Sequence, residues 1–189
     1  MCRTWCCLVA AIALAGPAAA GPMFVPLDFL PAENPFSEAW DVSADGSVVV
    51  GRAAHGELSE AFFWTAASGP VALGGVPSSR LFSRARGVAA DGTTIVGATE
   101  GLTGSSAFVW TASAGLVELG TLPGGSPSSY AVAVSTDGSA VAGSSDSGSG
   151  YQAFRWTSAG GMLGLGDLPG GSFESEATDM SADERASWA

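Results

Sequence analysis

The chain has 189 residues, with 18 acidic against 7 basic side chains, no lysine, and a net charge of −11. Such an acidic surface repels phosphate backbones, which argues against nucleic acid as a partner and favours solubility outside the cell. All three cysteines lie at positions 2, 6 and 7. The rest of the chain can therefore form neither a disulfide framework nor a thiolate metal site.

Residues 1–20 have the pattern of a signal peptide. Arg3 supplies the positive n-region, residues 5–15 are apolar, and residues 18–20 give an alanine cleavage motif. The apolar run is shorter than the ~20 residues that cross a bilayer. We therefore expect an exported protein, secreted, at the cell surface or in the periplasm. It should have no membrane span after cleavage, and a β-repeat domain over residues 21–189.

From about Leu27 onward the sequence repeats every 46 residues without insertion or deletion. A Leu-x-x-[Leu/Val]-Pro segment, an Asp-Gly pair and an Ala-Phe-x-Trp-Thr string keep this interval. A fixed period in this range indicates stacked supersecondary units, each unable to bury its apolar face alone. The predicted modules are residues 32–77, 78–123 and 124–169, with a partial module at 170–189.

Each module reads as four short strands, which in the first are residues 39–43, 47–51, 61–65 and 70–73. Four antiparallel strands in 40–50 residues is the size of a propeller blade, and no long apolar run has the helical period. The predicted fold is all-β. It consists of 46-residue four-stranded repeats forming propeller-like blades, incomplete at about three and a half modules, without a closed ring.

Side-chain periodicity within a module predicts which residues are buried. The Asp-Gly pair at 45–46 favours a type I′ hairpin turn between the first two strands. The two-residue period places Phe62 and Trp64 on one face of the third strand, toward the core between modules. The position before the Trp is Arg155 in the third module, so we expect that face to be partly solvated.

Three strings resemble the bacterial extracellular repeats known as HAF repeats. They are LGTLPGGS at 119–126, AVAVSTDG at 131–138 and AFRWT at 153–157. The resemblance covers about residues 27–183, although the His of the eponymous His-Ala-Phe triplet is replaced. The residues in its place are Glu60, Ser106 and Gln152. The resemblance implies an exported repeat protein, often with a C-terminal sorting or outer-membrane segment, without established enzymatic activity and without catalytic residues to transfer.

The residues taken individually predict no catalytic, cofactor-binding or metal site. One Asp per repeat is too few for a calcium loop, and turn chemistry accounts for it. The repeated Trp is interpreted as a core ladder and not as a sugar platform. His55, the only histidine, is interpreted as a solvated surface residue. A glycosidase needs two carboxylates held across a cleft, and nothing in the sequence pairs the available glutamates. These are Glu57, Glu60, Glu100, Glu174 and Glu176.

A candidate ligand face follows from strand parity. In an up-and-down module, the loops after strands two and four lie at one end, and here they keep their length but differ in chemistry. The segments are 52–60, 98–106 and 144–152, with 78–84, 124–130 and 170–176. Binding loops on a rigid scaffold usually differ in this way, so the difference indicates a ligand-binding role. The alternative interpretation is that these loops differ only because nothing constrains their sequence. The predicted contact residues are Arg80, Arg84, Tyr130 and Tyr151. Arg86 forms the one basic cluster of the sequence with Arg80 and Arg84, which is interpreted as a local counterweight to acidic loops, with an anion site as the alternative.

The expected function is a non-enzymatic extracellular or cell-surface scaffold or adhesion module, whose partner is a surface polysaccharide or a protein. The alternative is a glycan-binding or glycan-hydrolysing propeller. Two unpaired sheet edges predict self-association. The segment 184–189 departs from the repeat, which a single-base frameshift would explain, so we expect further 46-residue repeats downstream in another reading frame.

Overall fold

The computed structural model describes residues 26–33, 35–74, 80–170, 172–181 and 186–188. The predicted signal peptide lies outside this part, as do residues 182–185. No described residue is helical, so the described part contains no helix that could cross a membrane. The strands are β1 Ser37–Val42, β2 Val49–His55, β3 Leu58–Thr65, β4 Gly69–Ala72, β5 Arg80–Val88, β6 Thr94–Gly101, β7 Gly104–Thr111, β8 Gly115–Gly120, β9 Ser129–Val134, β10 Ala140–Ser147, β11 Gly150–Thr157, β12 Gly161–Gly164, β13 Ala177–Met180 and β14 Ala186–Trp188.

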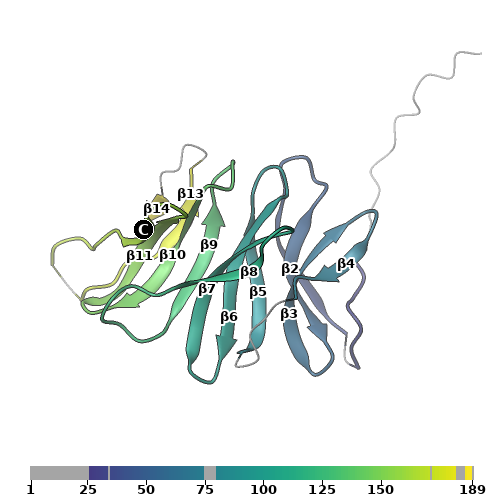
Figure 1. Cartoon of the computed structure of the whole chain (residues 1–189), viewed down its shortest axis with the longest axis horizontal. Coiled ribbons are helices and arrows are strands. Elements are labelled where there is room, and N and C mark those ends of the chain that lie inside the picture. The colour runs from purple at the N-terminus through teal and green to yellow at the C-terminus, as the bar shows by residue number, and fades with distance from the viewer. Residues whose placement is uncertain (1–25, 34, 75–79, 171, 182–185, 189) are drawn as a thin grey trace, which may run out of the picture.

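Consecutive strands pair antiparallel in units of four, and the units lie side by side along the chain (Figure 1). The first unit is β1–β4, the second β5–β8 and the third β9–β12, and β13 pairs with β14. A single parallel bridge between Ser59 and Phe82 joins the first two units into one sheet. The third strands end at Thr65, Thr111 and Thr157, at the 46-residue interval of the sequence. The prediction of an all-β fold is confirmed.

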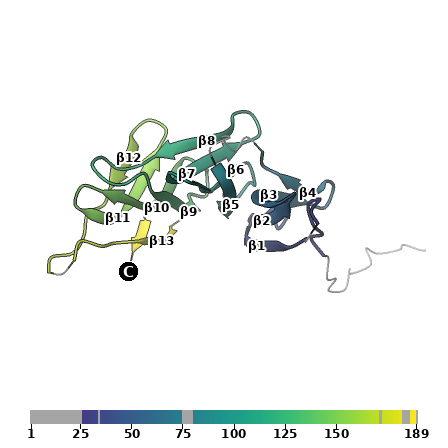
Figure 2. The ribbon, with the colours of Figure 1, turned by 90° about the horizontal axis from the view of Figure 1, so that it is seen from below.

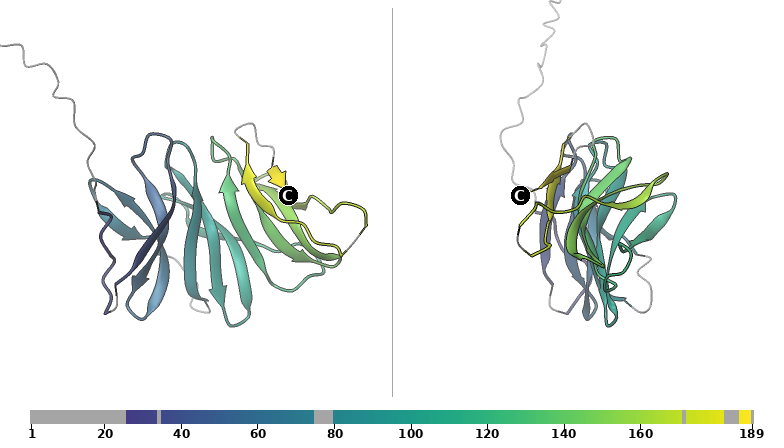
Figure 3. Two further views of the ribbon diagram at one scale, coloured as in Figure 1. Left: turned by 180° about the vertical axis from the view of Figure 1, so that it is seen from behind. Right: turned by 90° about the vertical axis from the view of Figure 1, so that its left-hand side faces the viewer.

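The first strands of the units lie along one side of the assembly and the fourth strands along the other (Figure 2). β1 contacts β5, β5 contacts β9, and β9 contacts β13. The twist of each sheet carries over to the next, so the units stack face to face in a curved row (Figure 3). Strand edges from different units therefore meet along the inner side of this row.

Several predicted loops are in fact strand. β2 and β3 continue through most of residues 52–60 and close on a two-residue turn at Gly56 and Glu57. The equivalent segments 98–106 and 144–152 are also hairpins closed by two residues. Their Ser, Gly and charged residues suggested loops, but cross-strand pairing needs only backbone groups, which any residue supplies. The polar outer part of each hairpin is strand that extends beyond the apolar core.

The end of the chain also differs from expectation. Residues 186–188 depart from the repeat and were not expected to form its second strand. They nevertheless pair with β13, with Trp188 opposite Ala177 and Ala186 opposite Met180. A strand's backbone can pair with a neighbouring edge even where its side chains do not follow the repeat.

The Asp-Gly turns have a different geometry from the predicted type I′. That turn needs positive φ at both central residues. Here Gly46, Gly92 and Gly138 have φ of 73°, 74° and 75°, whereas Asp28 is the one described non-glycine residue with positive φ. The aspartates act instead through their side chains. Asp45 accepts hydrogen bonds from the backbone N–H of Ser47 at 2.9 Å and from the Ser43 hydroxyl at 2.7 Å. The turn interpretation of these aspartates holds, with a different backbone class.

These hydrogen bonds favour the ionised carboxylate, so they lower its pKa. The N–H of Ser47, followed by the Ser43 hydroxyl, lowers the pKa of Asp45 to about 2. The hydroxyl of Ser135, followed by the N–H of Ser139, does the same for Asp137, also to about 2. A depressed pKa contributes stability above the ordinary value of 3.8 that is lost as the pH falls toward the folded-state value.

We therefore expect thermal stability to fall between about pH 4 and about pH 2, and the double variant Asp45→Asn/Asp137→Asn to show a shallower fall. Asn keeps an acceptor oxygen but does not titrate. The measurement is the melting temperature by circular dichroism across this range. The double variant Glu33→Gln/Glu57→Gln, at two exposed positions, controls for the change in net charge. Identical pH slopes for the double variant and the unmodified chain would contradict the assignment.

The core lies between units, as the two-residue period predicts. Phe62, Phe108 and Phe154 are fully buried, and each repeat's Trp is half-buried. Trp110 packs against Phe63 of the preceding unit, with ring centroids 5.6 Å apart. The side chain preceding each Trp is half-buried, as expected for a position that also accepts Arg155. Burial on both faces of the sheets explains how short repeats without disulfides form one continuous core.

A serine at each junction joins neighbouring units. The hydroxyl of Ser129 accepts a hydrogen bond from the Ala107 N–H at 2.8 Å and donates one to the Gly120 carbonyl at 2.6 Å. Ser83 and Ser175 stand 46 residues to either side and accept the N–H groups of Ala61 and Ala153. We call this repeated contact the serine clasp. It satisfies backbone groups that the sheet ladder leaves unpaired.

Candidate functional site

Two cavities open at the end of the units that carries the β2–β3 turns. The larger, of about 670 Å³, lies between the first and second units and is lined in part by Phe36, Arg52 and Phe82. The smaller, of about 230 Å³, lies between the second unit, the third unit and the start of β13, and is lined in part by Tyr130, Tyr151 and Glu176. Arg84 lines both cavities. The candidate site is therefore centred on the start of the first strands, where successive units meet.

Arg84 connects the two cavities. Its guanidinium forms an ion pair with Glu100 and packs over the ring of Tyr130, 5.4 Å from the centroid. The Tyr130 hydroxyl shares a hydrogen bond with Ser105 at 2.8 Å, which orients the ring. Cation–π packing and an ion pair together hold the guanidinium in one geometry.

A second aromatic–arginine stack lies on the neighbouring first strand. Arg86 packs over Trp40 at 4.7 Å, and Arg52 packs over the same ring at 5.5 Å. Arg52 is paired with Glu38 at 2.8 Å. We call Arg52, Arg84 and Arg86 the arginine cluster. It gathers half of the six arginines that follow the predicted signal peptide in an otherwise acidic chain.

Arg86 differs from the other two members of the cluster. No described acidic residue forms an ion pair with it. Partial burial, followed by the positive charges of Arg84 and Arg52, lowers the pKa of Arg86 below its usual value. The surroundings of Arg86 therefore disfavour its positive charge, which is stabilised mainly by the Trp40 ring. An anion bound to its N–H groups would stabilise this charge further.

The other wall of the smaller cavity has the opposite character. Tyr151 is half-buried there, and burial raises the pKa of its hydroxyl, with the negative charge of Glu176 acting in the same direction. Glu176 also lines this cavity. The smaller cavity therefore has cationic side chains at Arg84 and Arg86 and an acidic side chain beside Tyr151.

Glycines of the second strands set the position of this cluster. A Cβ on Gly97 would lie 1.9 Å from the Arg84 carbonyl oxygen, and one on Gly143 would lie 2.0 Å from that of Tyr130. The pairing of the first and second strands is irregular at these places, with a register shift between Ala85 and Gly87. Glycine is needed where a bulge brings two backbones this close.

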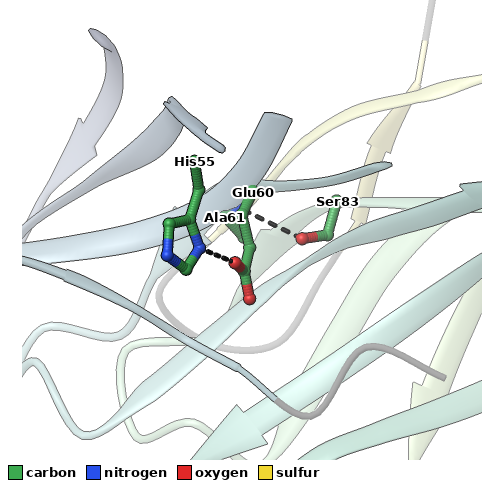
Figure 4. A network of polar contacts seen from close by, with 4 residues as sticks. All are labelled: His55, Glu60, Ala61 and Ser83. Atoms are coloured by element: carbon green, nitrogen blue, oxygen red, sulfur yellow. Dashed lines mark hydrogen bonds and ion pairs between the residues drawn. The ribbon is translucent and has the colours of Figure 1, made fainter. Parts of the chain in front are cut away.

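His55 lies at the rim, outside the arginine cluster. Its Nδ1 is 2.5 Å from a carboxylate oxygen of Glu60, and its side chain is 46% exposed (Figure 4). The interpretation as a surface residue is correct for exposure but missed this partner. Figure 4 also shows the Ser83 hydroxyl accepting the N–H of Ala61, so the serine clasp lies directly beside this pair.

The structure brings together three of the four predicted contact residues. Arg84, Tyr130 and Tyr151 all line the smaller cavity. Arg80 begins β5, and its side chain lies outside the described part. Their placement in loops was wrong: Arg84 belongs to β5, Tyr130 to β9 and Tyr151 to β11. These strand ends are polar because they line an open cavity, and that polarity made them resemble loops.

Sequence reasoning assigned no ligand role to Trp40 and Arg52 and considered an anion site at Arg86 only as an alternative, although a signal for Trp40 and Arg86 was present. Positions 38, 84, 130 and 176 are equivalent in the repeat and hold Glu, Arg, Tyr and Glu. The next column, 39, 85, 131 and 177, is alanine throughout. The column at 40, 86, 132 and 178 again varies, with Trp, Arg, Val and Thr. Repeat positions whose residue type varies, next to a position that is always alanine, are positions that the packing of the units does not constrain.

Three of the five glutamates considered for glycoside hydrolysis line these two cavities. Glu57 and Glu100 line the larger one, with Phe36 and Phe82 as aromatic neighbours, and Glu100 is held by Arg84. Glu176 lines the smaller one with the two tyrosines. Two of these carboxyls therefore share the larger cavity with aromatic rings, whereas the smaller cavity has one of them beside its tyrosines. Within the described residues, no group of three or more metal-ligating side chains is placed to hold a metal ion.

Comparison with protein-family models and with curated proteins gave no match. Among solved structures, the chain is similar to TolB from Acinetobacter baumannii, with a TM-score of 0.58 and 14% identity. The fold is of the β-propeller type. The match covers 82% of this chain and 37% of TolB, so the chain spans little more than a third of its neighbour's length. At this identity the likeness concerns the fold alone.

Proposed function

We propose that this protein is an exported, non-enzymatic binding module of the extracellular space, the cell surface or the periplasm. The observation that carries the proposal is the convergence of Arg84, Tyr130 and Tyr151 on one cavity. The residue types vary from unit to unit, whereas the surrounding alanines, turns and clasps recur. A constant frame with variable side chains at one end is the arrangement that binding proteins use.

The opposite end supports this division of roles. There the Asp-Gly turns of successive units are joined by backbone hydrogen bonds, from Ala44 N–H to the Ala90 carbonyl and from Ala90 N–H to the Thr136 carbonyl. Gly92 and Gly138 also approach the preceding unit closely. These turns hold the units together, beside an apolar cavity of about 530 Å³ lined in part by Val48, Phe63 and Trp110. The end that carries Arg84 and the two tyrosines has the side chains that differ from unit to unit, and the resemblance to HAF repeats is consistent with such an extracellular role.

The experiment uses the secreted chain, immobilised and exposed to arrays of cell-surface polysaccharides and of peptides. Replacing Arg80, Arg84, Tyr130 and Tyr151 together with Ser should abolish binding and preserve the β-sheet circular dichroism spectrum. Ser113→Ala/Ser158→Ala, in the β3–β4-type turns at the opposite end, is the matched control. Retained binding by the four-residue variant, or loss only in the control, would overturn the proposal. Arg84→Gln alone serves as a milder variant.

A glycan-binding or glycan-hydrolysing propeller is the alternative function. The same arrays separate it from the first proposal, because a hydrolase releases shortened saccharides with time whereas a scaffold retains them intact. Chromatography of the supernatant over a polysaccharide array measures this release. Products that disappear in Glu57→Gln or Glu100→Gln would establish the alternative and remove the non-enzymatic assignment.

A further inference from the structure

The three guanidinium groups of the arginine cluster differ in their partners, and this difference narrows the class of ligand that the proposed binding site accepts. Arg52 and Arg84 already have carboxylate partners in Glu38 and Glu100. Arg86 has a ring beneath it and no acidic partner among the described residues. A guanidinium stacked on an aromatic ring keeps its in-plane N–H groups directed outward, and this planar fork matches a carboxylate.

We infer that Arg86, stacked on Trp40, binds the carboxylate of a peptide chain end in the smaller cavity. This inference rests on the proposed binding function and names the chemistry of its ligand. The cavity holds the carboxylate near Arg84 and Arg86. Glu176, beside Tyr151, lies in the same cavity and accepts a donor such as a backbone N–H of the ligand. A terminal residue of a peptide carries both groups within one small unit.

Charge and packing favour this ligand over a polyanionic polysaccharide. The chain carries a net charge of −11, so a long polyanion is repelled by the surface as a whole. A single carboxylate, by contrast, is attracted by the positive charges of the nearby arginine cluster. The Trp40 ring is already packed by two guanidiniums and that of Tyr130 by one, which leaves less aromatic face for a sugar ring. The adjoining larger cavity offers Phe82 and Leu58, which suit apolar side chains.

The test compares two probes that differ only at the terminal group, which is a carboxylate in N-acetylphenylalanine and a neutral carboxamide in its amide. Binding to the secreted chain is followed by NMR through the tryptophan indole N–H signals. We expect the acid to bind about tenfold more tightly than the amide, the effect of one charge-assisted hydrogen-bonded pair. Arg86→Gln should reduce this preference to about twofold or less, and Arg86→Lys, which keeps the charge without the fork, to an intermediate value.

Two matched variants separate the site from general charge effects. Arg155→Gln removes one positive charge from β11, outside the lining of either cavity, and should keep the preference. Glu176→Gln weakens the acceptor for the ligand N–H, which both probes carry, and should therefore weaken binding of the acid and of the amide alike. Equal binding of acid and amide, or a preference that survives in Arg86→Gln, would overturn the inference.

The outcome also separates this inference from the proposed function. Array binding that depends on Arg84 and Tyr130 but shows no preference for free carboxylates removes the peptide-end ligand and leaves the binding module. Selective capture of uronate-containing saccharides would identify a sugar acid as the ligand and likewise overturn the peptide assignment. A carboxylate preference without any array binding would remove the scaffold role and leave the Arg86 site.

Discussion

Gly97→Ala is expected to lower the free energy of unfolding by about 3 kcal/mol, the upper end of the usual cost of overpacking. A Cβ at this position would lie 1.9 Å from the Arg84 carbonyl oxygen and 3.0 Å from the Cα of Ala85. Both are backbone atoms, so no side-chain rotation relieves the overlap. β5 has to move away from β6, and this movement also displaces the arginine cluster.

Urea unfolding monitored by tryptophan fluorescence measures this loss. Gly148→Ala is the control, because its added Cβ meets nothing closer than 3.6 Å, which is ordinary van der Waals contact. Gly143→Ala should resemble Gly97→Ala, since its Cβ would approach the Tyr130 carbonyl at 2.0 Å. A Gly97→Ala protein as stable as Gly148→Ala would show that the close strand approach is not part of the fold.

Ser129→Ala is expected to cost about 2 kcal/mol of unfolding free energy. The substitution removes a clasp that satisfies the buried N–H of Ala107 and the carbonyl of Gly120. Each buried group left without a hydrogen bond costs about 1–3 kcal/mol, and the small cavity left by the hydroxyl limits access of replacement water. The loss should be cooperative, because the clasp joins the second and third units.

Thermal and urea unfolding of Ser129→Ala should therefore shift together, in one transition. Ser149→Ala, at an exposed hairpin turn, is the control and should change stability by no more than about 0.5 kcal/mol. Two separate transitions for Ser129→Ala would contradict this expectation, because they would show that the units unfold independently. An unchanged midpoint would show that Ser129 contributes no net stabilisation.

The repeat period determined the strand count of a unit and the identity of its buried residues. A period of two is sufficient to place Phe62, Phe108 and Phe154 in the core, since alternate residues of a strand share a face. The limits of strands were predicted less well. Apolar content marks where a sheet is covered, whereas backbone pairing continues beyond that point, as the hairpin of β10 and β11 does.

The candidate residues Arg84, Tyr130 and Tyr151 were selected from the sequence by chemical divergence at one end of the modules. Their neighbours were not, because contacts such as Arg86 with Trp40 join strands of different units. The residues of such a pair lie about one repeat apart in the chain, and their approach depends on how the units stack. Hydrophobic periodicity predicts which face of a single strand is buried, but it does not predict how the units stack on one another.

The glycines of the Asp-Gly turns also separate what the sequence determines from what the tertiary structure determines. The sequence alone determined that Gly46 and Gly92 close equivalent turns, because both need a positive φ that glycine adopts without strain. Only the tertiary structure distinguished them. A Cβ on Gly92 would lie 2.6 Å from a methyl group of Val48 in the preceding unit, whereas one on Gly46 would meet nothing within 4 Å. Local conformation is encoded within each repeat, but steric contact depends on which unit is packed beside it.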